Sequence, residues 1–80
     1  MDDQDIVRQI GQLADEEHAL ERAHAGDPLG EPELVRLRDI EVALDQCWDL
    51  LRQRRARRNA GQDPDAATLR PPSVVERYQQ

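Results

Sequence analysis

The stretch DQCWDLLRQRRARR, residues 45–58, holds the residue types most able to do chemistry in this chain. It contains the only cysteine, Cys47, and the only tryptophan, Trp48, and five of its last seven residues are arginine. A thiol can act as a nucleophile or metal ligand, a tryptophan can anchor a partner, and clustered guanidinium groups can bind phosphate. The stretch therefore raises three hypotheses: a redox or metal site, a protein interface and a nucleic-acid contact.

The arginine run at 52–58 has the composition of a phosphate-binding patch. In an antiparallel hairpin, acids near the N-terminus would face it. The expected pairs are Asp5 with Arg52, Asp3 with Arg54 and Asp2 with Arg55. Arg57 and Arg58 would extend beyond these acids without partners. No aromatic residue interrupts the run to stack bases, and a net charge of −6 opposes binding to a polyanion. We favour an ion-paired helix face. Docking on RNA, RNA polymerase or a ribosome through this helix end is the alternative.

The sequence ERAH at 21–24 has the Glu-x-x-His spacing that di-iron helical bundles use. A metal set would combine Glu17, Glu21, His24 and Glu41. His24 stands at the end of its predicted helix beside a glycine turn, so these ligands would converge poorly. Charged residues three or four positions apart are common on any solvated helix. We expect salt bridging here and no bound cofactor, with a metal site as a minor alternative.

Cys47 falls inside a predicted helix, and the neighbouring acids would not activate its thiol. We expect it to be a small buried hydrophobe. Trp48 either closes the apolar seam near Ile10 or anchors a partner, and both interpretations stay open. The chain has no glycine-rich phosphate loop and no serine–histidine or cysteine–histidine arrangement that the hairpin would bring together, so we expect no enzymatic activity.

The elements that must position these residues are two helices joined by a tight turn. Apolar residues spaced three or four apart predict an amphipathic helix over about 3–25. Residues 25–33 contain two glycines and two prolines, which indicates a turn at 26–30. No glycine or proline interrupts the following segment, so the second helix is predicted to span about 31–60.

The second helix carries an apolar stripe wider than packing against one neighbour requires. Leu37, Leu44 and Leu51 repeat every seven residues, and other apolar residues flank them on both sides. A short turn implies antiparallel helices, with Leu13 near Leu44 and Ile6 near Leu51. We infer one contact seam for the first helix and one for another chain. The predicted fold is all-α: a coiled-coil-like antiparallel hairpin that dimerises into a four-helix bundle.

The small size of the chain supports an assembly. Eighty residues bury little apolar surface, and the absence of phenylalanine leaves an aliphatic core. We therefore expect a homodimer or an unidentified protein partner, and a role in protein–protein interaction or regulation. The residues expected to make such contacts are Leu44, Cys47, Trp48, Leu51, Arg54, Arg55, Arg57, Arg58 and Tyr78.

Residues 1–60 form the predicted hairpin and residues 61–80 a partly ordered tail. Asp63 before Pro64 predicts a short helical turn, and Ser73 has capping-box spacing for a last short helix. We expect the tail to lie back on the hairpin or on a partner. The chain shows no signal-peptide pattern and no apolar window that could span a bilayer, and one cysteine cannot form an internal disulfide. We expect a cytoplasmic protein without membrane contact.

Four segments resemble a family of short actinobacterial proteins classed as a domain of unknown function. They are EEHAL at 16–20, LDQCWDLLRQRRARR at 44–58, GQDPD at 61–65 and RPPSVVERY at 70–78. The resemblance covers nearly the whole chain and implies a helical hairpin with a tail, without an activity, cofactor or catalytic residue. In that family a serine or aspartate usually caps the second helix, whereas Gly30 stands before that helix here.

Overall fold

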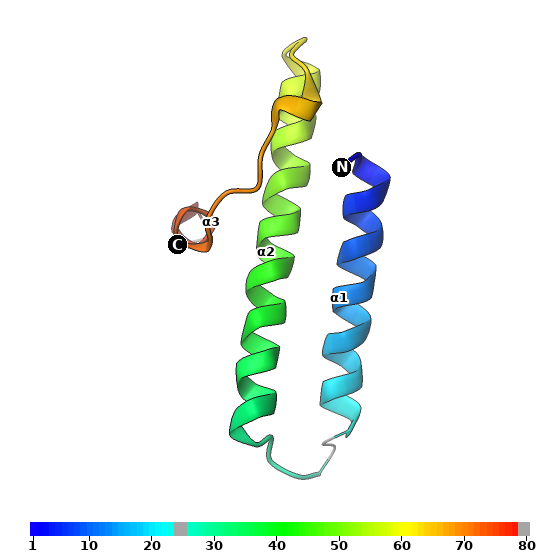
Figure 1. Cartoon of the computed structure of the whole chain (residues 1–80), viewed down its shortest axis with the longest axis vertical. Coiled ribbons are helices and arrows are strands. Elements are labelled where there is room, and N and C mark those ends of the chain that lie inside the picture. The colour runs from blue at the N-terminus through cyan, green and yellow to red at the C-terminus, as the bar shows by residue number, and fades with distance from the viewer. Residues whose placement is uncertain (24–25, 79–80) are drawn as a thin grey trace.

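A computed structural model describes residues 1–23 and 26–78 of this chain, with side chains up to Val75. Two long helices, α1 (Asp3–Ala23) and α2 (Glu31–Asn59), are followed by a 3-10 turn, η1 (Pro64–Ala66), and a short helix, α3 (Pro72–Tyr78). Figure 1 shows α1 and α2 side by side and antiparallel, with the tail returning along α2 and α3 on the side of α2 away from α1. The prediction of an all-helical hairpin with a short tail is confirmed.

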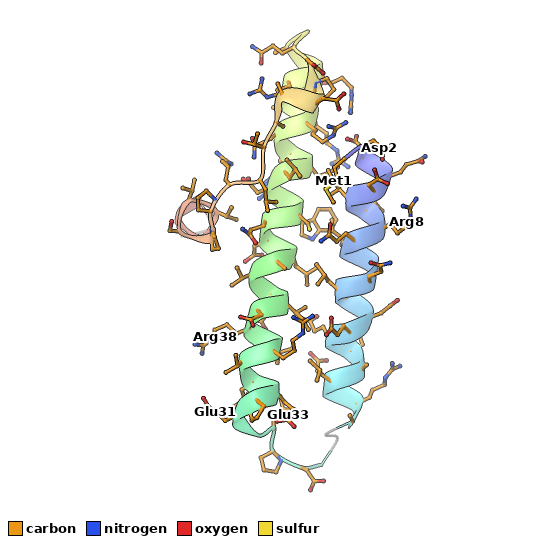
Figure 2. The ribbon with its side chains drawn as sticks, in the orientation of Figure 1. Met1, Asp2, Arg8, Glu31, Glu33 and Arg38 are labelled. Atoms are coloured by element: carbon orange, nitrogen blue, oxygen red, sulfur yellow. The ribbon has the colours of Figure 1, made fainter. Side chains whose placement is uncertain are left out.

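The start of α1 is fixed by two aspartates three residues apart. The backbone N–H of Asp5 donates to Oδ1 of Asp2 at 2.8 Å, and the N–H of Asp2 donates to Oδ2 of Asp5 at 3.2 Å. This reciprocal capping satisfies two amides that the first helical turn leaves without partners. In Figure 2 Met1 lies on the α2 side of this helix start, whereas Arg8 points away from α2.

The two ends of α2 are closed in different ways. At the start, Gly30 provides no side-chain cap, and a Cβ there would lie 2.7 Å from Oε2 of Glu33. The Glu33 side chain therefore occupies the space that a capping side chain would fill. At the end, Gly61 adopts a φ of 74°, and the N–H of Gln62 donates to the carbonyl of Arg57 at 2.7 Å. A glycine in the left-handed conformation lets these helix-closing bonds form.

The main core lies between the first half of α1 and the second half of α2. Ile6 is fully buried in one cluster with Cys47, Leu50 and Leu51, which confirms the register that placed Ile6 near Leu51. Three further side chains pack against this cluster, namely Ile10, Leu13 and Ala67. The core is thus small and aliphatic, and one of its members, Ala67, comes from the tail.

Towards the turn, polar contacts hold the helices together. Arg36 of α2 donates from Nε and Nη2 to the two carboxylate oxygens of Glu16 of α1, both at 2.7 Å. This bidentate pair lowers the pKa of the Glu16 carboxyl below its ordinary value. Ile40 is fully buried along this half of α2. The hairpin is therefore tied by an apolar cluster at one end and an ion pair at the other.

The tail gives the molecule the shape of a thin slab. Its Cα atoms extend 50 × 25 × 16 Å. α1, α2 and α3 lie in one layer in the view down the shortest axis (Figure 1), and the tail helix buries Val75. Part of α2 that α1 leaves uncovered is thus occupied by the same chain. Within the described residues no helix combines the length and apolar character needed to cross a membrane.

The core predicts unequal costs for two truncations on α2. Leu51 is 1% exposed and Val35 is 52% exposed. Leu51→Ala removes buried methyl groups and leaves a cavity, so the free energy of unfolding should fall by about 2–4 kcal/mol. Urea unfolding followed by circular dichroism, at a fixed protein concentration, measures this change. Val35→Ala is the control, and an equal loss in both variants would contradict the assigned core.

Candidate functional site

Arg54 is buried where α1, α2 and η1 meet. Its side chain is 7% exposed, and its Nε donates to Oδ1 of Asp3 at 2.6 Å. Nη1 donates to Oδ1 of Asp65 at 2.9 Å and to the carbonyl of Pro64 at 3.2 Å. One guanidinium therefore joins the start of α1, the end of α2 and the first turn of the tail, and the hydrogen bond that it donates to Asp3 raises its pKa above the ordinary value. The predicted pairing of Asp3 with Arg54 is confirmed.

The other predicted charge pairs need correction. Arg58, expected to have no partner, donates to Oδ2 of Asp3 at 3.0 Å. Arg54 and then Arg58 hold the pKa of the Asp3 carboxyl below its ordinary value. Asp2 and Asp5 do not reach Arg55 and Arg52, because they cap α1. Asp5 also pairs with Arg8 at 3.2 Å, one helical turn away.

A strip of polar side chains on α2 holds the tail, and we name it the tail clamp: Gln46, Asp49 and Gln53. Asp49 is only 2% exposed and accepts from Nε of Arg70 at 2.8 Å and from the Nη2 of the same guanidinium. Gln53 donates to Asp49 at 3.0 Å and to the carbonyl of Thr68 at 2.9 Å. Gln46 donates to the carbonyl of Arg70 at 3.1 Å. The clamp thus binds both the side chain and the backbone of the tail.

The arginine contact also determines the charge state of Asp49. The hydrogen bonds from Arg70 hold the pKa of this carboxyl below its ordinary value, although burial acts in the opposite direction. A buried charge is tolerated only when it is paired and hydrogen-bonded. Asp49 meets this condition, and none of the buried polar side-chain atoms of the described residues lacks a hydrogen-bond partner.

Sequence reasoning missed the clamp, although a signal was present. Gln46, Asp49 and Gln53 are spaced three and four residues apart, so they share one face of the helix beside the apolar stripe. The predicted tail holds two arginines, Arg70 and Arg77, that could meet this face. The pattern could have predicted that a polar segment packs there, but it could not have identified the segment.

Cys47 lies against an apolar cavity of about 290 Å³ between α1, α2 and the segment before α3. The lining residues are Met1, Ile6, Gln9, Ala43, Gln46, Cys47, Leu50 and Leu69. Burial raises the pKa of the Cys47 thiol, so the reactive thiolate is disfavoured. Its predicted place as a small buried hydrophobe is confirmed.

The opposite side of the slab presents what we name the open face: Val7, Leu37, Leu44 and Trp48. Gln46 lines the cavity, Cys47 faces the core, and Trp48 is the next residue, turned a further 100° or so around α2. On α1 the same geometry holds: Gln9 lines the cavity, Ile6 faces the core, and Val7 points to the side of the helix away from Gln9. Trp48 is 44% exposed and Val7 is 54% exposed, while Leu37 and Leu44 are half-buried. These apolar side chains are only partly covered by their own chain.

The remaining predicted contact residues differ in how available they are. Cys47, Leu51 and Arg54 are buried within the chain, so the structure does not support a role for them in contacting a partner. Arg55 is exposed and Arg57 is half-buried, and neither forms an ion pair with the rest of the described chain. The side chain of Tyr78 falls outside the described residues.

The proposed metal ligands do not form a site in the part of the chain that the structure describes. No three histidine, cysteine, aspartate or glutamate side chains of these residues are grouped to hold an ion. His24, which the Glu-x-x-His pattern required, lies outside the described residues.

Figure 2 shows Glu31 and Glu33 at the turn end of α2, with Arg38 pointing away from α1.

Comparison with known proteins gives relatives over nearly the full length. Residues 2–80 match the family described as Protein of unknown function (DUF2630). The chain is 49% identical over 78 residues to the uncharacterized proteins Rv0898c of Mycobacterium tuberculosis and Mb0922c of Mycobacterium bovis. The alignment covers 95% of this chain and 88% of each relative. No solved structure matches the chain significantly.

Removing the charge of Asp49 should release the tail without unfolding the hairpin. In Asp49→Asn the guanidinium of Arg70 loses its carboxylate, while the shape of the side chain is kept. We expect amide exchange of residues 64–75 to accelerate by about tenfold or more, because a buried charged hydrogen bond is lost. Hydrogen exchange read by mass spectrometry measures this. Asp39→Asn, an exposed change on the same helix, should leave the tail protected. Equal protection in both variants would exclude the clamp.

The same carboxylate predicts an acid-dependent release. A lowered pKa in the folded state means that Asp49 stabilises docking above its ordinary value of 3.8, and that this contribution is lost as the pH falls below 3.8 towards the folded-state pKa. NMR signals of residues 68–75 should therefore shift progressively towards unfolded positions as the pH falls from about 3.8 through the folded-state pKa. In Asp49→Asn this pH dependence of the tail signals should be lost. A pH-independent tail in the unmodified protein would contradict the assignment.

Proposed function

We propose that this chain, which belongs to the family described as Protein of unknown function (DUF2630), is a non-enzymatic helical module that binds a second copy of itself through its open face. Neither the family description nor the relatives names a reaction, ligand or partner. The support therefore comes from the surfaces of the molecule and from the charges that its own contacts leave unused.

The observation that carries this proposal is the open face, whose apolar side chains are only partly covered by their own chain. The tail packs on one side of α2, yet Trp48 on another side remains 44% exposed. Leu37 and Leu44 share its side of α2, and Val7 adds a fourth apolar side chain from α1. Large exposed aromatic side chains are typical anchors of protein interfaces. A partner that packs on this face would bury apolar surface that the chain itself leaves in water.

The limited core of the chain supports the same proposal. Within the described residues six apolar side chains are buried, and none of them is aromatic. A domain of this size gains little stability from its own core, so association is a common way to add buried surface. Self-association uses one surface twice, which makes it the simplest way to cover an open face.

The titratable groups support a role other than catalysis. The lowered pKa values of Asp3 and Asp49 arise from arginines that join helices to the tail, so both carboxylates are occupied by structural contacts. The raised pKa of Cys47 disfavours nucleophilic chemistry. A lone cysteine also cannot form a disulfide within the chain, and we therefore propose a reducing, cytoplasmic location.

Phosphate binding is the weaker alternative. Of the five arginines between 52 and 58, Arg54 and Arg58 are engaged with Asp3, and Arg54 also with Asp65. Their charge is therefore partly neutralised before any nucleic acid approaches. Binding to RNA that weakens steeply as salt rises from about 50 mM would favour this alternative over self-association.

Self-association predicts a concentration-dependent mass. Sedimentation velocity at micromolar concentrations should detect a species of twice the chain mass. Trp48→Ala should raise its dissociation constant by at least about tenfold, because truncating a central aromatic anchor often costs 2 kcal/mol or more.

Val35→Ala provides the control for an exposed apolar side chain elsewhere on α2, and it should leave the dissociation constant unchanged. A protein that stays a folded monomer at all concentrations up to about 100 µM would refute self-association, because its dimer would then be held by less than roughly 5.5 kcal/mol.

A further inference from the structure

We infer that two copies pair α2 against α2 in the antiparallel sense, with a two-fold axis at Trp48. Glu41 of one copy then lies opposite Arg55 of the other, and Asp45 lies opposite Arg52. This inference rests on the proposed self-association and adds its register. It is carried by the order of charges along the open side of α2.

The spacing of charged residues around Trp48 is nearly symmetric. Glu41 lies seven residues before Trp48 and Arg55 lies seven residues after it. Seven residues make nearly two full turns of an α-helix, so these three side chains share one face of α2. Asp45 and Arg52, at three residues before and four after, flank the tryptophan on the same side. The face therefore reads acid, acid, tryptophan, arginine, arginine.

A two-fold axis turns this order into matched pairs. In an isologous interface residue i of one copy meets residue j of the other, and j meets i in return. With the axis at Trp48, the Glu41–Arg55 pair and the Asp45–Arg52 pair each occur twice in the dimer. A parallel arrangement would instead set Glu41 against Glu41 and Arg55 against Arg55, and like charges across an interface disfavour that arrangement.

The side chains involved form no ion pair or hydrogen bond within the described residues of one copy, although the charge of Arg52 acts on Asp49 one turn away. Glu41, Arg52 and Arg55 are exposed, and Asp45 is half-buried. None of the four forms an ion pair or hydrogen bond within the described part of the chain. The contrast with Arg54 is informative, because that neighbouring arginine is buried and shared by two acids. Internal ion pairs use one face of this helix end, and among the described residues the charged side chains of the Trp48 face form none.

A charge exchange tests the register. Glu41→Arg should raise the dissociation constant of the dimer by about tenfold, because it replaces two attractive contacts with two repulsive ones. Arg55→Glu should have a similar effect. The double variant Glu41→Arg/Arg55→Glu restores opposite charges across the axis and should return to within about threefold of the unmodified protein. Sedimentation velocity over a concentration series gives these constants, and circular dichroism verifies that each variant is folded.

The matched control is Asp39→Arg, which makes the same change of net charge. Asp39 is exposed and lies two residues before Glu41, so it points about 200° away around α2. This variant should leave the dissociation constant unchanged. An equal weakening by Asp39→Arg and Glu41→Arg would indicate a general charge effect and would overturn the register.

Crosslinking gives an independent reading of the same register. In a Cys47→Ala background, chains with Glu41→Cys are mixed with chains carrying Arg55→Cys and then mildly oxidised. We expect a disulfide between position 41 of one chain and position 55 of the other. Efficient linkage between two copies of the Glu41→Cys chain would overturn the antiparallel arrangement.

The outcomes separate this inference from the proposal on which it rests. A dimer that Trp48→Ala weakens, but that Glu41→Arg and Arg55→Glu leave intact, overturns the register and retains self-association. Additive weakening in the double variant also overturns the register. A monomeric unmodified protein removes both the register and the proposed function.

Discussion

The arrangement of this small molecule depends on the contacts of the Arg54 guanidinium. This group binds Asp3 at the start of α1 and Asp65 with the carbonyl of Pro64 in the tail, while its side chain is almost fully buried. A buried arginine needs partners in several directions, and its planar fork fixes their positions. One side chain therefore aligns the hairpin and also turns the tail back along α2.

The tail clamp on α2 continues the attachment of the tail further along the helix. Gln46, Asp49 and Gln53 bind Arg70 and the tail backbone, and Ala67 packs against the core. The tail is thereby held to one side of α2. Because consecutive residues of a helix point in different directions, a tail bound at Asp49 leaves Trp48 uncovered. The internal contacts of the chain thus select the surface that faces solvent.

Particular residues show how much of this could be predicted. The heptad of Leu37, Leu44 and Leu51 and the glycine-rich turn predicted the hairpin and its register, because helical periodicity is a local property of the sequence. The pairing of Asp3 with Arg54 followed from that register. The pairing of Asp49 with Arg70 did not follow from the register. The tail bends at two turns before it reaches Arg70, and small changes in those turns move Arg70 by many ångströms. The tail was expected to lie back on the hairpin or on a partner, but the side of α2 that it covers was not predicted.

The sequence by itself determined the two helices, their antiparallel order and the aliphatic seam between them. These features depend on residue spacing within short segments. Only the tertiary structure decided which charges are used internally and which remain available. Asp2 and Asp5 cap their own helix, Asp3 binds both Arg54 and Arg58, and Arg55 is left exposed. The physical reason is that an ion pair requires a separation of about 4 Å or less, and side-chain positions at that scale follow from packing and not from register alone.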